Sequence, residues 1–332
     1  MTTIELDNGY TSSVGHPGDL DDLVDLYRAS EAALEGRPRI DRDWIDTQFR
    51  EVGFDPERDV LSVRDDAGTL VGAAMVESRD PFVSSFCSQA ILPGVTDDAV
   101  AEAIIAFAIA RTTDNIPLAP EGARVVASIG IHERDQPMLE RLIDRGFSQE
   151  RSFLEMEIEL DDEVTVPPLP DDVTVRTLGA DEALDRLVVA VRDSFRDHFG
   201  FVDQPMELRL QRWQEFRKAD SWDNDLVFLA ESDGELVGVN VCLRRNGSDT
   251  DQGYVATLGV LPDHRGRGIA RYLLLACFAE YQRRGLSSVS LHVDAQSITG
   301  ATRLYEGVGM HRSQVHLDFE YEIRDGEDLV RR

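Results

Sequence analysis

One pattern occurs twice in this chain and restricts its fold more than any other feature of the sequence. The stretch Gly-x-Leu-Val-Gly begins at Gly68 and again at Gly234, 166 residues later, each time inside a strand–turn–strand pattern. Each half then continues through a strand, a helix, another strand and a last helix. These helices end at Gly146 and Gly309, 163 residues apart. Because the offset is nearly constant over a whole domain, the sequence predicts duplication of one α+β domain and not a solenoid.

The segment between the halves indicates where one domain ends. Three prolines between residues 164 and 172 exclude helix and central strand there. We expect an N-terminal domain at 1–160, a Pro-rich linker at 161–172 and a C-terminal domain at 173–325. Each domain should hold a mixed, mostly antiparallel twisted sheet flanked by helices. The residues from Asp325 onward are predicted to form a frayed tail.

Charge and cysteine content exclude several classes of protein. With 63 acidic and 34 basic residues, the net charge is −29, so most of the surface repels nucleic acid and anionic membrane and mildly favours cationic substrates. The three cysteines lie far apart without CxxC spacing, which predicts buried free thiols and no metal site. No signal-peptide pattern and no membrane-length apolar run are found in the sequence, so we expect a cytoplasmic monomer or homodimer.

The most informative stretch joins a strand to a helix through glycines. Residues 254–260 are rich in strand formers, and from residue 271 apolar side chains repeat at helical spacing. The first turn of a helix leaves backbone N–H groups unpaired and carries partial positive charge, and glycine lets a phosphate approach closely. A capped helix after a surface turn is the plainer interpretation. The agreement of strand, loop and helix favours binding of a pyrophosphate or similar anion by Arg265, Gly266, Arg267, Gly268, Ile269, Ala270 and Arg271.

This loop resembles motif A of the GCN5-related N-acetyltransferases (GNAT), whose pattern is [Q/R]-x-x-G-x-[G/A]. Arg265, Gly268 and Ala270 occupy its defining positions. The resemblance covers about residues 173–323, and a tandem with one degenerate half is similar to mycothiol synthases and related actinobacterial acetyltransferases. It implies that the loop amides hold the pyrophosphate of acetyl-CoA. It also implies that the preceding strand pairs with the pantetheine arm through the backbone of Leu258, Gly259 and Val260.

The same resemblance implies residues for the acyl transfer. Tyr305 matches the family tyrosine that protonates the departing thiolate, a step that a proton donor assists. A packing role for this tyrosine is the alternative interpretation. Ser297 stands where the family carries an Asn, so we expect a cofactor contact with shorter reach.

A base for the acceptor amine is less clearly indicated. Many members carry a Glu on the strand before the loop, where this chain has Tyr254, which cannot serve as a carboxylate base. This absence counts against mycothiol synthesis. His292 lies on the next strand, where ribosomal-protein alanine acetyltransferases carry a Glu base, and a neutral imidazole suits proton removal. A solvated strand histidine is the alternative. Asp294 on the same face could bind a cationic substrate.

Two other regions bear on the site. The aromatic residues between 195 and 222 are interpreted either as walls of an amine pocket or as core. In the N-terminal half, the matching segment 89–99 has one glycine, no arginine and two aspartates, and Leu142 aligns with Tyr305. Aspartate at a helix start repels phosphate. We therefore expect the N-terminal half to be a scaffold without an anion site or an acid.

Together these features predict an acetyl-CoA-dependent N-acetyltransferase. The predicted reaction moves the acetyl group to a primary amine of a small molecule by direct attack in a ternary complex. Acetyl-CoA is the cosubstrate, and no metal or nucleic acid takes part. Two alternatives are a CoA-binding sensor without activity and an acetyltransferase of protein N-termini.

Overall fold

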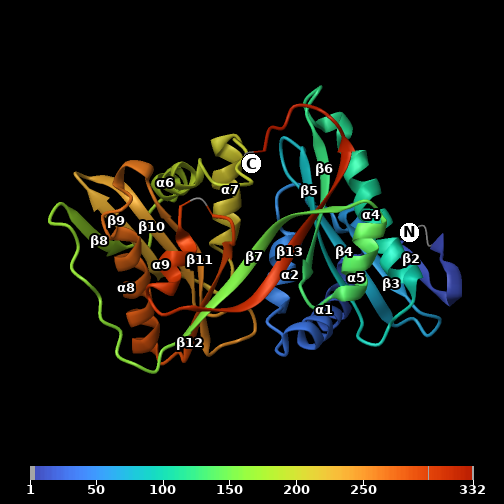
Figure 1. Ribbon diagram of the computed structural model, residues 1–332, viewed down its shortest axis with the longest axis horizontal. Coiled ribbons are helices and arrows are strands. Elements are labelled where there is room, and N and C mark those ends of the chain that lie inside the picture. The colour runs from blue at the N-terminus through green and yellow to red at the C-terminus, as the bar shows by residue number, and fades with distance from the viewer. Residues whose placement is uncertain (1–3, 298, 331–332) are drawn as a thin grey trace. The chain divides into compact units, whose positions relative to one another are not determined.

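The computed structural model describes residues 4–297 and 299–330, which belong to two compact units. Unit 1 runs from the N-terminus to Phe153 and includes Gln314–Val330, and unit 2 spans Leu154–Ser313. This division differs from the predicted limits at 160 and 173, because the last strand of each half belongs partly to the other unit. Strand β7 (Ser148–Glu159) crosses at Phe153, and β13 (His311–Arg324) crosses at Ser313 (Figure 1).

The sheet of unit 1 has the strand order β1-β2-β3-β4-β5-β6-β13. Its neighbours are antiparallel except for β5 and β6, which run parallel. Its strands are β1 (Ile4–Glu5), β2 (Thr11–Val14), β3 (Val60–Arg64), β4 (Leu70–Ser78), β5 (Ser84–Ile91) and β6 (Val125–His132). Its α-helices are α1 (Leu20–Glu35), α2 (Arg42–Phe49), α3 (Pro56–Asp59), α4 (Asp98–Asp114) and α5 (Gln136–Asp144).

Unit 2 repeats this plan with the strand order β7-β12-β11-β10-β9-β8. Strands β8 to β11 pair antiparallel, and β11 and β12 pair parallel. Its further strands are β8 (Val173–Thr177), β9 (Trp222–Ser232), β10 (Glu235–Leu243), β11 (Gln252–Val260) and β12 (Ser288–Asp294). Its α-helices are α6 (Asp185–Phe195), α7 (Met206–Phe216), α8 (Ile269–Arg284) and α9 (Ala301–Glu306). The α+β fold predicted for each half is thereby confirmed.

Strand β9, which lies between β10 and the edge strand β8, shows why unit 2 needs helices on both faces of its sheet. Leu226 and Phe228 pack in the core that contains α8, whereas Val227 and Leu229 pack with α6. Successive side chains of a strand point to opposite faces, so a continuous apolar run requires cover on both. The phosphate loop and helix α8 consequently lie on one side of the sheet and α6 on the other.

The repeated Leu-Val-Gly of the sequence marks the same local structure in both units. The strand register shifts at Val71 and at Val237, so each of these residues forms a β-bulge. At the following glycine a helix packs directly on the strand. A Cβ on Gly72 would meet Val100 of α4 at 2.4 Å, and one on Gly238 would meet Ile269 of α8 at 3.1 Å. The motif therefore seats the helix that follows the loop.

Two segments with irregular structure are held by hydrogen bonds. Residues 161–170 lack helix and strand, as the prolines require, and the Val164 N–H donates to Gln282 Oε1 (3.1 Å) within unit 2. The tail is ordered as far as Val330, so the prediction of fraying from Asp325 is wrong. The Glu327 N–H donates to the Gly122 carbonyl (2.7 Å), and the Arg124 N–H donates to the Glu327 carbonyl (2.8 Å).

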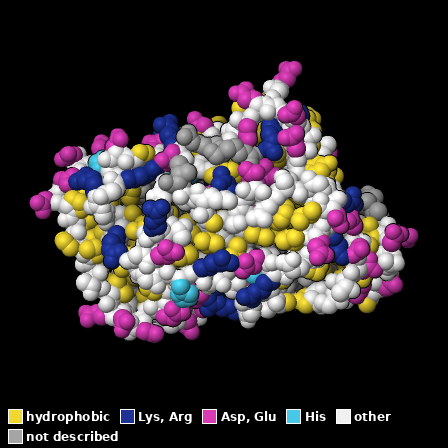
Figure 2. Space-filling view, viewed as in Figure 1, with side chains coloured by type: hydrophobic (Ala, Val, Ile, Leu, Met, Phe, Trp, Pro, Cys, Tyr) yellow, Lys and Arg dark blue, Asp and Glu magenta, His cyan; other side chains and the backbone are white. Residues whose placement is uncertain are grey.

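The surface agrees with the charge of the sequence. Figure 2 shows acidic side chains spread over the visible face, with basic ones between them. Among the helices that the structure describes, none has the length and apolar character needed to cross a membrane. All three cysteines are buried free thiols, as predicted.

Candidate active site

The predicted phosphate loop has the backbone geometry of an anion site. After β11 the chain passes through a short 3-10 turn (Pro262–His264) and enters helix α8 at its N-cap, Gly268. Gly266 and Gly268 adopt left-handed φ angles of +74° and +83°, and a Cβ on either would meet nothing within 4 Å. Both are exposed, so the outer side of the loop is open.

The amides of this loop are not used in hydrogen bonds with other described residues of the protein. Within the described part of the chain, the N–H groups of residues 266–271 donate to no protein acceptor, and the N-cap has no side-chain hydrogen bond. The first turn of α8, a helix of 16 residues, also carries partial positive charge. These groups can hold a phosphate without rearrangement.

The three arginines of the loop bond to protein groups. Arg265 donates to the carbonyls of Val260 (3.1 Å) and Ser194 (2.8 Å) and to both carboxylate oxygens of Asp197, one of them at 2.9 Å. Its hydrogen bond lowers the pKa of Asp197. Arg265 therefore ties the loop to the end of α6.

The other two guanidinium groups are held in the same way. Arg267 bonds to Asp172, whose pKa falls to about 2 mainly because of this bond. Arg271 donates to the Gly307 carbonyl (2.7 Å). The sequence predicted the charge of these arginines at the loop but not their partners. The backbone amides, unlike these guanidinium groups, have no partner among the protein residues that the structure describes and are the groups predicted to bind the anion.

The contact between Arg265 and Asp197 can be tested by a double-mutant cycle. We expect Arg265→Met and Asp197→Asn to be non-additive in urea unfolding, with a coupling energy of about 1 kcal/mol, as for a partly exposed bidentate pair. Acetyl-CoA affinity in titration calorimetry should change less than about threefold in Asp197→Asn. Loss of binding in Arg265→Met with full binding in Asp197→Asn would instead assign the guanidinium directly to phosphate.

The sheet opens next to the loop. Parallel pairing between β11 and β12 covers only Gln252–Val255 with Ser288–Leu291, whereas β11 stays paired to β10 as far as Val260. A bulge at Ala256, which has no partner on β10, lies where the two strands part. We call this place the fork. Beyond it, Leu258, Gly259 and Val260 carry a backbone edge turned away from β10.

Gly259 has a packing reason in addition to its predicted backbone role. A Cβ there would meet the Ser194 Cβ at 2.7 Å, so the glycine allows α6 to lie close to β11. The end of α6 is also where Arg265 binds. The close packing of α6 therefore constrains this position.

Tyr305 lies in α9 and packs in the core of unit 2 with 7% of its surface exposed. Burial raises the pKa of its phenol to about 12. A phenol that keeps its proton at neutral pH is available as a hydrogen-bond and proton donor. Ser297 lies before α9, and its hydroxyl bonds to Thr299 Oγ1 (2.9 Å). Residue 298 lies outside the described residues.

Tyr254 and His292 form a pair that sequence reasoning missed. Tyr254 lies opposite Ser290 in the parallel register, so His292, two residues further along β12, shares its face. Tyr254 Oη lies 3.1 Å from His292 Nδ1, and the ring centroids are 5.9 Å apart. His292 is exposed. The sequence indicated only that the two residues lie on successive strands, and it did not indicate their pairing.

The aromatic residues near α7 belong to the core. Trp213, Phe216 and Trp222 contact one another edge to face, with ring centroids 5.4–6.3 Å apart, and pack with α6. The pocket interpretation fails for these three. The turn after α6 is different, because the tilted rings of His198 and Phe195 pack with centroids 4.6 Å apart and burial lowers the pKa of His198.

The matching loop of unit 1 is built differently. Asp97 caps α4 by accepting the Ala99 N–H (2.9 Å) and also accepts from Asn8 (2.8 Å). The loop borders a cavity of about 340 Å³ whose lining includes Leu92, Val95 and Met138. Leu142 is fully buried in the core, where no acid is available.

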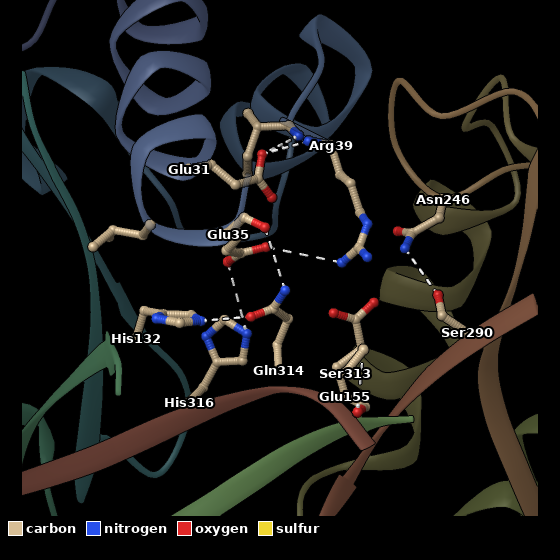
Figure 3. Close-up of polar contacts among 12 residues, drawn as sticks. Glu31, Glu35, Arg39, His132, Glu155, Asn246, Ser290, Ser313, Gln314 and His316 are labelled. Carbon is tan, nitrogen blue, oxygen red and sulfur yellow. Dashed lines mark hydrogen bonds and ion pairs between the residues drawn. The ribbon is translucent and has the colours of Figure 1, made fainter. Parts of the chain in front are cut away.

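Unit 1 also contains a polar cluster away from that loop. His132 Nδ1 accepts the Arg134 N–H (3.1 Å), so Nε2 carries the proton and donates to Gln314 Oε1 (2.9 Å). His316 lies beside it, 3.8 Å from a carboxylate oxygen of Glu35 (Figure 3). Gln314 and His316 come from β13, so the last strand of the chain completes this cluster. In the described residues, no group of three or more His, Cys, Asp or Glu side chains could hold a metal ion.

The fold and site agree with comparisons to known proteins. The sequence profile described as the Acetyltransferase (GNAT) family matches residues 188–310. A mycothiol acetyltransferase from Acidothermus cellulolyticus is 31% identical over 277 residues, which is 79% of each chain. The chain therefore belongs to the GNAT family, and it is an acetyl-CoA-dependent N-acetyltransferase.

More particular likenesses follow within that family. A mycothiol acetyltransferase from Salinispora arenicola is 27% identical over 78% of this chain and 80% of its own. The crystal structure of a GCN5-related N-acetyltransferase from Sphaerobacter thermophilus matches with a TM-score of 0.81 at 27% identity, covering 98% of this chain and 99% of that one. A tandem GNAT protein from the clavulanic acid pathway matches with a TM-score of 0.70 at 16% identity, over 97% and 100%, and supports the fold. The two units make this chain a tandem member.

Proposed function

We propose that unit 2 transfers the acetyl group of acetyl-CoA to a primary amine of a small molecule. The observation that carries this proposal is the open glycine loop at the start of α8, which lies beside the fork in the sheet. The pyrophosphate lies on the amides of 266–271, and the pantetheine arm follows the backbone edge of Leu258, Gly259 and Val260. This path brings the thioester to the fork.

The transfer is direct, within a ternary complex. An acyl-enzyme would need an accessible nucleophile, and all three cysteines are buried. Burial raises the pKa of Cys87 to about 12 and also raises that of Cys277, so neither is a thiolate at neutral pH. The amine attacks the thioester carbonyl, the C–S bond breaks, and Tyr305 gives a proton to the departing sulfur. His292 is the base in this scheme.

The acceptor is an amine related to mycothiol. The support is the name shared by relatives that align over most of both chains. The absence of a Glu at position 254 counts against this acceptor. However, His292 on the neighbouring strand β12 contacts Tyr254 and supplies a titratable group beside that position. Asp294 adds negative charge on this face, which suits a cationic amine.

The test is an acetylation assay with acetyl-CoA against a cysteinyl amino sugar, a plain amino sugar, a diamine and a peptide. Mass spectrometry detects the acetylated amine, and Ellman's reagent detects released CoA for acceptors without a thiol. Because the protein's own thiols are buried, native protein should give almost no Ellman background. We expect acetylation of the cysteinyl amino sugar to be the fastest. Tight acetyl-CoA binding without acetylation of any amine would contradict the proposal and indicate a sensor.

A further inference from the structure

We propose that Tyr254 and His292 act together as a proton relay, in which the Tyr254 hydroxyl receives the proton of the acceptor ammonium and His292 Nδ1 takes the proton that Tyr254 releases. This inference rests on the proposed function of unit 2. It assigns a catalytic role to Tyr254, which stands where many family members carry Glu.

The position of the pair supports a role in the reaction. Tyr254 lies near the end of the parallel pairing between β11 and β12, one residue before the final pair formed by Val255 and Leu291. The bulge at Ala256 follows at once, and bulges re-aim side chains where a sheet opens. The hydroxyl is therefore held at the mouth of the fork, on the side of the sheet opposite α8.

The contact lets a proton pass between the phenol and the imidazole, and the tautomer of His292 sets which atom donates. Tyr254 Oη and His292 Nδ1 are 3.1 Å apart, within reach of a hydrogen bond. When the phenol donates to Nδ1, its oxygen still has a lone pair for an N–H of the substrate. The neutral imidazole then carries its own proton on Nε2. Because His292 is exposed, that proton can leave to water once Nδ1 is protonated.

The proton balance closes over the whole reaction. The ammonium gives one proton to Tyr254 Oη as Tyr254 protonates His292, which discharges to solvent. The neutral amine forms the C–N bond, the C–S bond breaks, and the thiolate takes a proton from Tyr305. The nitrogen then loses a second proton to solvent, and solvent returns one proton to Tyr305. The products are the amide, CoA thiol and one proton released to water.

Other titratable groups also lie on this side of the sheet. Asp294 follows on β12, Asp197 and His198 lie in the turn after α6, and Arg265 holds that turn. These groups are unchanged in variants of Tyr254 or His292. Their effects on pH dependence therefore cancel when variant and wild type are compared at each pH.

The experiment measures kcat/KM for Tyr254→Phe, His292→Gln and the double variant from about pH 6.5 to 9.5. The substrate is the amine that wild type acetylates fastest. At pH 7 we expect each single variant to lose about 100-fold, the low end for acid–base catalysis, and the double variant to lose no more. The deficit should shrink as pH rises toward the pKa of the amine, because solvent then supplies the neutral form.

A merely structural role predicts a different result. A misplaced strand would lower the rate by the same factor at every pH, so a pH-independent ratio overturns the relay, as does an unchanged rate in either variant. His311→Gln and Tyr321→Phe are matched controls on β13 and should keep wild-type rates. Acetyl-CoA affinity should be unchanged in all variants. If wild type acetylates no amine at all, the proposed function has failed, and not the relay alone.

Discussion

Replacing Gly268 by Asp is expected to weaken acetyl-CoA binding about 10³-fold. The glycine is the N-cap of α8, and its missing Cβ leaves the loop open. A carboxylate about 4 Å from a phosphate is repelled by about 4 kcal/mol at an effective dielectric constant near 20, which corresponds to that loss. Titration calorimetry with acetyl-CoA measures the effect.

The same helix offers a matched control. Gly285 caps the C-terminal end of α8 with φ +84°, nearly the φ of Gly268, and a Cβ there also meets nothing within 4 Å. Gly285→Asp introduces the same left-handed aspartate and the same charge, so its loss of stability should be at least as large. It should nevertheless bind acetyl-CoA like wild type. Equal affinities for the two variants would refute the assignment of the loop.

Replacing Tyr305 by Phe is expected to lower kcat by about 10²–10³-fold and to leave acetyl-CoA affinity unchanged. The phenol hydroxyl is the proposed donor to the departing thiolate, and removal of a general acid has an effect of this order. Its pKa, raised to about 12 by burial, keeps the proton on Tyr305 throughout the neutral range. Single-turnover measurement of acetyl transfer separates this step from binding.

Tyr27 in unit 1 provides the control for loss of a buried hydroxyl. Its exposed fraction of 6% is similar to the 7% of Tyr305, but its hydroxyl donates to the Ser88 carbonyl (3.0 Å). Tyr27→Phe should lower stability by about 1 kcal/mol and keep kcat, because it removes a hydrogen bond within unit 1 and no group of the proposed site. Tyr305→Phe should instead lower kcat and keep stability at neutral pH. Wild-type turnover in Tyr305→Phe would remove this residue from the mechanism.

The raised pKa of Tyr305 also predicts where pH acts on the fold. An unfolded tyrosine titrates near pH 10, so the folded state holds the phenolic proton more tightly. The contribution of Tyr305 to stability is therefore complete below about pH 10 and is lost as pH rises toward about 12. Tyr305→Phe should flatten this alkaline decline of the thermal midpoint.

Local signals in the sequence predicted the loop but not what its side chains bind. Glycines and the helix start are properties of neighbouring residues, and they predicted the turn at Gly266 and Gly268 that leads into α8, whereas anion binding there stays a prediction. The partner of Arg265 is Asp197, 68 residues away, and His292 lies 38 residues from Tyr254. Such contacts depend on strand register and helix placement, which no short pattern encodes.

The fold shows the same contrast. Periodicity and turns gave the repeated α+β plan, and the prolines at 161–172 suggested a division between domains. The pairing of β13 with β6 joins residues more than 180 positions apart, and nothing in the local sequence of either strand specifies its partner. The aromatic residues near α7 were ambiguous for a related reason, because helical spacing fits both a pocket wall and a core.

Each unit includes part of the last strand of the other half of the chain, and this limits how the gene could be divided. Unit 1 needs residues 314–330 from the far end of the chain, and unit 2 needs residues 154–160 from before the prolines. Cutting the gene at the Pro-rich segment would leave each product with an open sheet edge, where unpaired N–H and C=O groups invite aggregation. Although the loop of unit 1 carries Asp97 and no arginine, the two halves depend on each other, because neither sheet is complete without a segment from the other half of the chain.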